Sequence, residues 1–210
     1  MNKIDYNKAM LEIIKSNGWQ KKKILLHSCC APCSTACIDR LIDYFDITIF
    51  YYNPNIDTLD EFNLRATEQV RYSKSLGIDC IVADYDKQSF LSQVNGLEKE
   101  REGGVRCEKC FNLRLEKTAL KCKELGYDYF ATTLTVSPLK NAKLINEIGF
   151  NLEKSLGAKY LPSDFKKQNG YLNSIRLSKE NNLYRQNYCG CEFALKIQQI
   201  EAPESLNKKY

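Results

Sequence analysis

KILLHSCCAPCSTACIDRLIDYFDITIFYYN, residues 23–53, contains a complete strand–helix–strand pattern. The apolar run at 23–28 predicts a buried strand, residues 33–44 have helical spacing, and 46–53 predict a second strand. Strands joined through a helix run parallel, and the crossover between them is right-handed. This segment therefore predicts a parallel sheet with helices packed on its faces.

The same alternation continues along the chain. Strand patterns recur at 79–85, 127–135 and 158–165, and helical patterns at 57–76, 86–95, 107–126, 139–156 and 169–181. We expect one α/β domain over residues 1–210, built on an open doubly wound parallel sheet of about five strands. A helical segment (1–22) would precede it, and a C-terminal helical extension (165–210) would cover the site. Such sheets bind ligands at the carboxyl ends of their strands, near the topological switch point.

Composition narrows the class of protein. The 43% hydrophobic and 27% charged residues are typical of a globular protein, which at this size can bury a core without a metal. No run of about 18 apolar residues suggests a membrane span, and the first 23 residues lack the apolar region of a secretory signal. We therefore expect a cytoplasmic protein with no membrane partner. The net charge of +5 is mild, with local basic spots at 21–23, 166–167 and 208–209.

Ten cysteines are the most informative feature of the composition. Without export, clustered thiols indicate metal ligands or redox groups rather than disulfides. Seven fall in three groups: CCxxC at Cys29, Cys30 and Cys33, CxxC at Cys107 and Cys110, and CxC at Cys189 and Cys191. We expect the first two groups to meet at the carboxyl edge of the sheet. We interpret the other three, Cys37, Cys80 and Cys122, as small buried hydrophobic residues, and the single histidine, His27, as a packed core residue.

The number of clustered thiols suggests what they bind. A [4Fe–4S] cluster usually takes four thiolates, which leaves three for a second metal ion with an open coordination position. We assign Cys29, Cys30, Cys107 and Cys110 to the cluster, and Cys33, Cys189 and Cys191 to the second ion. Spacing alone also fits a closed zinc site with four cysteines. A thioredoxin-like redox pair fits less well, because Cys107 follows a long loop rather than the first strand.

Five separated motifs also carry a resemblance to a known family. In order they are LLHSCCAPCS, FYYNPNI followed by Glu61 and Arg65, RCEKCFNLRL, TTLTVSP, and DFKK with LYRQNYCGCEF. From about Lys23 to Phe193 this pattern resembles the QueH-type epoxyqueuosine reductases. The resemblance implies removal of the epoxide oxygen from epoxyqueuosine at the wobble position of tRNA, the last step of queuosine synthesis. It further implies a PP-loop/HUP-like scaffold, a [4Fe–4S] cluster beside a second metal ion, iron, and no cobalamin.

The first motif also bears on the use of ATP. In PP-loop ATPases an SGGxDS loop binds phosphate after the first strand, whereas this chain has His27 to Cys33 at that place. The exchange replaces a backbone anion cradle with thiolates, so we expect no ATP. It argues against an iron–sulfur tRNA thiolase on the same scaffold, which would need ATP. A zinc-structured RNA-binding module is the remaining alternative.

Reducing an epoxide to an alkene and water consumes two electrons and two protons, so we expect an external electron donor. An open position on the second ion would act as a Lewis acid toward the epoxide oxygen. Tyr188 and Asp164 are the candidate proton donors.

Substrate-binding candidates follow from their places in the predicted elements. Glu61 and Arg65 share a helix face, where they form either a surface ion pair or a substrate contact. Tyr171 and Tyr184 either stack on bases or pack as ordinary aromatic residues. The other candidates are polar groups at strand ends and tRNA contacts of the C-terminal extension: Asn53, Asn55, Thr132, Thr133 and Ser137, then Lys166, Lys167, Arg185 and Gln186.

Overall fold

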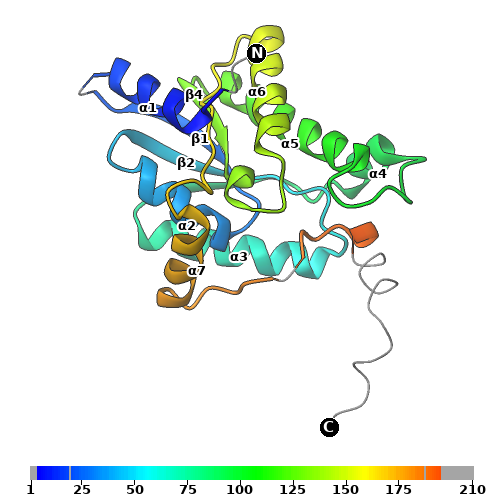
Figure 1. Ribbon diagram of the computed structural model, residues 1–210. Coiled ribbons are helices and arrows are strands. Elements are labelled where there is room, and N and C mark those ends of the chain that lie inside the picture. Colours follow the sequence, from blue (N-terminus) through cyan, green and yellow to red (C-terminus); the bar gives the residue numbers. More distant parts are fainter. Residues whose placement is uncertain (1–3, 19, 187, 195–210) are drawn as a thin grey trace.

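A computed structural model describes residues 4–18, 20–186 and 188–194 (Figure 1). Its sheet contains four parallel strands in the order β3-β2-β1-β4. Their bounds are β1 (Lys22–His27), β2 (Phe45–Tyr51), β3 (Asp79–Val82) and β4 (Tyr129–Thr132). The last four residues of β1 are all buried, as expected of a central strand covered on both faces.

The predicted fifth strand, 158–165, is wrong, and the sheet has four strands rather than about five. This segment makes one parallel bridge, Tyr160 to Phe130. Pro162 has no N–H to donate to a ladder. The next amide, Ser163 N, donates instead to the side-chain Oδ1 of Asn146 at 2.9 Å. The segment therefore leaves the sheet after a single pairing.

Helices cover both faces of the sheet (Figure 1). One face carries α2 (Ala31–Leu41), α3 (Leu59–Ser75) and α7 (Gly170–Glu180), and the other carries α5 (Val105–Glu124) and α6 (Ala142–Leu156). The remaining helices are α1 (Tyr6–Ser16), α4 (Lys87–Val94) and a short 3-10 helix, η1 (Thr133–Val136). No helix among the described residues is long and apolar enough to cross a membrane.

Alternation along β1 separates two cores. Ile24 and Leu26 pack in one core with Ile38 of α2, whereas Leu25 packs in the other with Leu115 of α5. Successive side chains of a strand point to opposite faces, so one buried strand supplies both cores. Both cores are apolar and extensive.

The order of the strands fixes where a ligand can bind. The chain runs outward from β1 through β2 to β3, then crosses to the other side of β1 to form β4. The switch point therefore lies between the carboxyl ends of β1 and β4, where His27 is in register with Thr132. Residues after α7 also reach this edge, because Asp57 N donates to Gly190 O at 2.9 Å.

Candidate metal centre and active site

The CCxxC group lies where β1 turns into α2. Cys30 is the N-cap residue of α2, and Pro32 occupies its first turn, where a missing N–H costs no helical hydrogen bond. The Sγ atoms of Cys29, Cys30 and Cys33 all lie within 4.8 Å of one another. The positive end of the α2 dipole favours thiolates here. Three converging sulfurs form a soft donor set, suited to iron or zinc.

One negative charge is shared within this group. Hydrogen bonds from Cys30 and Cys33 hold the pKa of the Cys29 thiol well below its usual value. The same hydrogen bond to Cys29 raises the pKa of Cys30 to about 12, and that of Cys33 is also raised. Cys29 is therefore the thiolate that the other two thiols stabilise.

The other two cysteine groups meet at a second cavity of about 250 Å³. Cys107 and Cys110 come from the first turns of α5, and Cys189 and Cys191 from the segment after α7. Cys107 Sγ accepts a hydrogen bond from Gly103 N at 3.2 Å. A hydrogen bond from Cys191 lowers the pKa of Cys189 to about 6 and raises that of Cys191.

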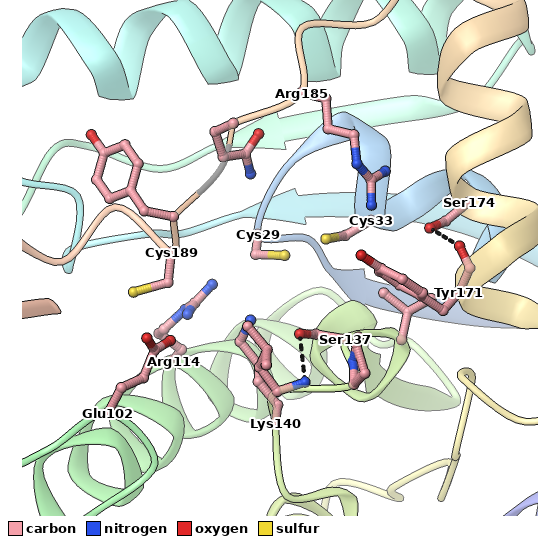
Figure 2. Close-up of a pocket in the computed structure, with 15 residues that line it drawn as sticks. Cys29, Cys33, Glu102, Arg114, Ser137, Lys140, Tyr171, Ser174, Arg185 and Cys189 are labelled. Atoms are coloured by element: carbon pink, nitrogen blue, oxygen red, sulfur yellow. Dashed lines mark hydrogen bonds between the residues drawn. The ribbon is translucent and has the colours of Figure 1, made fainter. Parts of the chain in front are cut away.

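The two sites adjoin. Cys29 and Cys33 line a cavity of about 370 Å³, and Cys189 lies in the walls of both cavities (Figure 2). The three groups therefore converge at the carboxyl edge of the sheet, as predicted. The sulfurs are divided as Cys29, Cys30 and Cys33 against Cys107, Cys110, Cys189 and Cys191, which differs from the expected division between cluster and second ion.

Arg114 joins the two groups, and the sequence analysis missed it. It lies one helical turn after Cys110, with only 3% of its surface exposed, in the walls of both cavities. Its Nη1 is 4.0 Å from Cys110 Sγ, and its Nε donates to His27 Nε2 at 3.3 Å. Its Nη2 donates to Asn53 Oδ1. The spacing of four residues between Cys110 and Arg114 in RCEKCFNLRL is the sequence signal that could have pointed to it, because such residues share a helix face.

His27 is a packed core residue, as expected, and it also orients Arg114. Burial, together with the charge of Arg114, lowers the pKa of His27 to about 3, so the imidazole is neutral. Both ring nitrogens have polar neighbours: Nε2 lies 3.3 Å from Arg114 Nε and 3.2 Å from Tyr52 O, and Nδ1 lies 2.8 Å from Thr132 Oγ1. Of the three single cysteines, Cys37 and Cys122 are buried in the apolar cores as predicted, whereas Cys80 packs against one core but is only partly buried.

The predicted strand-end residues surround these groups. Asn53 Nδ2 donates to Ser28 O at 2.9 Å, and Asn55 Nδ2 donates to Cys189 O at 3.1 Å. Thr133 Oγ1 accepts from Cys29 N at 3.3 Å. Among these residues, Ser137 lines the first cavity and Asn55 lines the second.

Glu61 and Arg65 form the predicted pair, 2.6 Å apart, but Arg65 is buried rather than on the surface. Its guanidinium lies 5.0 Å from the centre of the Tyr188 ring. A side chain at Gly190, whose φ is +97°, would come within 3.2 Å of Arg65 Nη1. The pair therefore packs against the CxC segment (residues 188–194). Tyr188 of this segment lines the first cavity.

The remaining predicted residues divide between the cavity and the surface. Arg185 and Gln186 line the first cavity, and the Arg185 guanidinium is 5.7 Å from the centre of the Tyr171 ring. Asp164 lines neither cavity and pairs with Lys166 at 3.1 Å. Of the predicted basic spots, Lys167 is exposed on the surface, and residues 21–23 lie at the start of β1, at the end of the sheet opposite the site. Residues 208–209 lie outside the described residues.

Fold and site together define a class: an α/β protein of the doubly wound kind, with a cluster of cysteines able to hold a metal at the switch point of its sheet. The family model "Epoxyqueuosine reductase QueH" matches residues 24–197. The chain therefore belongs to the epoxyqueuosine reductase QueH family, a family of oxidoreductases, as the five motifs predicted.

Relatives of this family are similar over most of their length. The Streptococcus pyogenes epoxyqueuosine reductase QueH is 46% identical over 209 residues, covering 95% of this chain and 81% of that protein. The Thermotoga maritima protein of the same name is 34% identical over 192 residues, covering 89% and 96%. Among solved structures, the U34-tRNA thiolase NcsA from Methanococcus maripaludis with its [4Fe-4S] cluster has a TM-score of 0.54 at 15% identity, covering 93% of this chain and 70% of that one. This likeness concerns the fold alone.

Proposed function

We propose that this chain reduces the epoxide of epoxyqueuosine in tRNA to the alkene of queuosine. Family membership supports the reaction, and one observation carries the assignment to this site: three cysteine groups, far apart in the sequence, converge around two adjoining cavities. Electrons come from an external donor. The place of action is the cytoplasm, and ATP takes no part.

The donor set fits the iron groups that this reaction needs. Six of the seven thiols line the two cavities, and the Sγ of the seventh, Cys30, lies within 4.8 Å of those of Cys29 and Cys33. In the wall of the second cavity, the buried Nε and Nη2 of Arg106 have no hydrogen-bond partner among the residues that the structure describes. Buried donors without a partner are expected where an anionic group, such as a thiolate-bound iron–sulfur cluster, accepts from them. When bound, a [4Fe–4S] cluster supplies electrons singly, and a second ion, iron, offers an open position to an oxygen ligand.

The protein's own residues hold and shape this site. Arg114 places a fixed positive charge between the two cysteine groups, and neutral His27 keeps that guanidinium in place. Arg185, Gln186 and Tyr171 stand at the first cavity, where they would hold a base turned out of the anticodon loop. Tyr188, in the same wall, is the candidate proton donor that we retain.

The proposed function is tested in tRNA. Nucleosides from cells that lack this protein and any other reductase of this kind should contain epoxyqueuosine in place of queuosine, as seen by mass spectrometry. Re-expression of the wild-type chain should restore queuosine, whereas Cys110→Ala should not. Unchanged queuosine in the deleted cells would remove the assignment.

We further propose that Cys29, Cys30, Cys107 and Cys110 hold the cluster, and that Cys33, Cys189 and Cys191 hold the second ion. The position of Arg114 supports this, because its charge acts on both Cys29 and Cys110. Under this division Cys30→Ala loses the absorbance of the cluster near 400 nm, roughly where Cys-held clusters absorb. Cys191→Ala keeps most of that absorbance and loses turnover.

In the competing division, Cys107, Cys110, Cys189 and Cys191 hold the cluster, and the three thiols of the CCxxC group hold the second ion. It predicts the reverse result for this pair of variants. Cys30→Ala would then keep the cluster, and Cys191→Ala would lose it. Cys122→Ala is the control for the loss of any cysteine. Cys122 lies on α5, is buried in the apolar core and lines neither cavity.

A further inference from the structure

Lys140 has a position that no motif indicated. It lies in the turn between η1 and α6, which begins at the carboxyl end of β4. Its backbone is held on both sides: Lys140 N donates to Ser137 O at 3.3 Å, and Lys166 Nζ donates to Lys140 O at 3.5 Å. Asn141, the next residue, caps α6 by accepting from Leu144 N at 3.2 Å. The turn is therefore well fixed, and it presents the Lys140 side chain to the site.

The Lys140 side chain lies in the walls of both cavities and is the one lysine, within the part of the chain that the structure describes, that does so. Figure 2 shows it extending from its turn toward Cys29. In its ordinary protonation state a lysine side chain is an ammonium, so it brings a positively charged donor to this place.

The ammonium of Lys140 has no hydrogen-bond or salt-bridge partner among the described residues. Two buried arginines of this edge do have partners: Arg65 pairs with Glu61, and Arg114 donates to His27 and Asn53. Lys140 is thus a charged donor that faces open volume between the two cysteine groups. A ligand that extends through both cavities would have Lys140 in its surroundings.

We propose that the ammonium of Lys140 donates a hydrogen bond to the epoxide oxygen of the substrate; this rests on the proposed function. In the reaction both C–O bonds of the epoxide break, a C=C bond forms, and the oxygen leaves as water. The external donor supplies the two electrons, and the two protons come from the proton donor of the site and from solvent. Negative charge develops on that oxygen as the C–O bonds break. A cationic donor placed beside this oxygen stabilises the charge more in the transition state than in the ground state.

The chemistry also distinguishes this role from simple neutralisation of the thiolates. Arg114 and the N-terminus of α2 already place positive charge beside Cys29 and Cys110. A lysine needed only as a counter-charge would be required for holding iron. A lysine that contacts the substrate oxygen is required for turnover and not for the metal.

The test uses Lys140→Met and Lys140→Arg, purified without oxygen and reconstituted with iron and sulfide. Three quantities are measured: visible absorbance, the Kd for an anticodon stem-loop that carries epoxyqueuosine, and the single-turnover rate with dithionite. We expect Lys140→Met to match wild type in absorbance and in Kd, and to lose about 100-fold in rate. Lys140→Arg, which keeps a charged donor, should recover a large part of that rate.

The matched control is Lys143→Met, three residues along, whose side chain is 70% exposed and lies on the first turn of α6. It should behave as wild type in all three measurements. A wild-type rate in Lys140→Met, a loss of absorbance in parallel with the rate, or a loss confined to affinity would each overturn the role of Lys140. Wild-type protein that binds iron and the stem-loop without reducing it would instead remove the proposed function, and this role with it.

Discussion

Arg106 shows how a single buried charge can organise one side of the site. Only 1% of its surface is exposed, and its Nη1 donates to the carbonyl oxygens of Leu97, Glu98 and Glu100. Its guanidinium lies 5.3 Å from the centre of the Phe193 ring. One side chain therefore connects the loop before α5, the start of α5, and the CxC segment.

Arg106→Met should destabilise the protein even without metal. Methionine fills similar space but leaves the carbonyl oxygens without this donor, and a lost buried partner costs about 1–3 kcal/mol. Urea unfolding of the metal-free protein, followed by circular dichroism, measures the change. Lys109→Met, at an exposed position of the same helix, is the control. An unchanged midpoint in Arg106→Met would show that the loop carbonyls are satisfied in another way.

The contrast between the cysteines and the cations explains what the sequence can predict about this site. Clustered thiols are rare and their spacing is local, so the seven ligand candidates could be named without a structure. Lysine and arginine are usually exposed, and their burial is decided by neighbours distant in the sequence. Arg106, Arg114 and Lys140 were missed for that reason. Asp164 was chosen from a motif, but its carboxylate faces Lys166 and not a cavity.

Among the helices, α6 carries a glycine in an unusual place. Gly149 lies in the helix interior, where glycine normally costs about 1 kcal/mol relative to alanine. A Cβ built there would lie 2.4 Å from the ring of Tyr160, which is buried. The ring occupies the space that a side chain would need, and this contact joins α6 to the bridge beside β4.

Gly149→Ala should therefore destabilise the protein, although helix propensity favours alanine. Overpacking a filled core costs about 1–3 kcal/mol, more than the gain in propensity. The free energy of unfolding is measured for Gly149→Ala, Tyr160→Leu and the double variant. If the ring is the cause, the alanine should cost much less in the Tyr160→Leu background. Equal costs in both backgrounds would place the strain elsewhere.

The same region shows where prediction of the elements fails. Strands β1, β2, β3 and β4 and the helices between them follow from local periodicity, and their observed bounds fall close to the predicted ones. The segment 158–165 has the apolar pattern of a strand, but the side chain of Asn146 of α6 forms hydrogen bonds with its backbone. Asn146 Nδ2 donates to Ser163 O at 2.8 Å, and Oδ1 accepts from Ser163 N. A side chain from a distant helix replaces the ladder, and no local pattern reports it.

Across the whole molecule, the clustered thiols lie at the margin of the apolar cores: Cys33 packs against one of them, and Cys29 and Cys107 pack against the other. The cores lie on the two faces of the sheet and consist of aliphatic and aromatic residues from β1, β2, α2, α5 and α6. The thiols stand at the carboxyl edge, at the margin of these cores. The CxC segment, residues 188–194, is held there by polar contacts, among them Asp57 N to Gly190 O, Asn55 to Cys189 O, and Lys87 between Asp57 and Glu192. It also packs in a small apolar cluster with Phe90 and Val94, apart from the two large cores.

Removal of iron should consequently loosen one edge and leave the fold intact. Burial of the two cores stabilises a chain of this size without help from a metal, unlike a zinc finger, which unfolds without its ion. Far-UV circular dichroism should be the same before and after chelation, and unfolding should stay cooperative. Hydrogen exchange should increase in residues 188–194 and in the loop before α5, while β1 and α6 keep their protection. Exchange that rises through β1 as well would mean that iron–thiolate bonds are part of the folding free energy. The edge and the cores would then be one cooperative unit, and the cysteine variants that lose iron would lose their structure along with their activity.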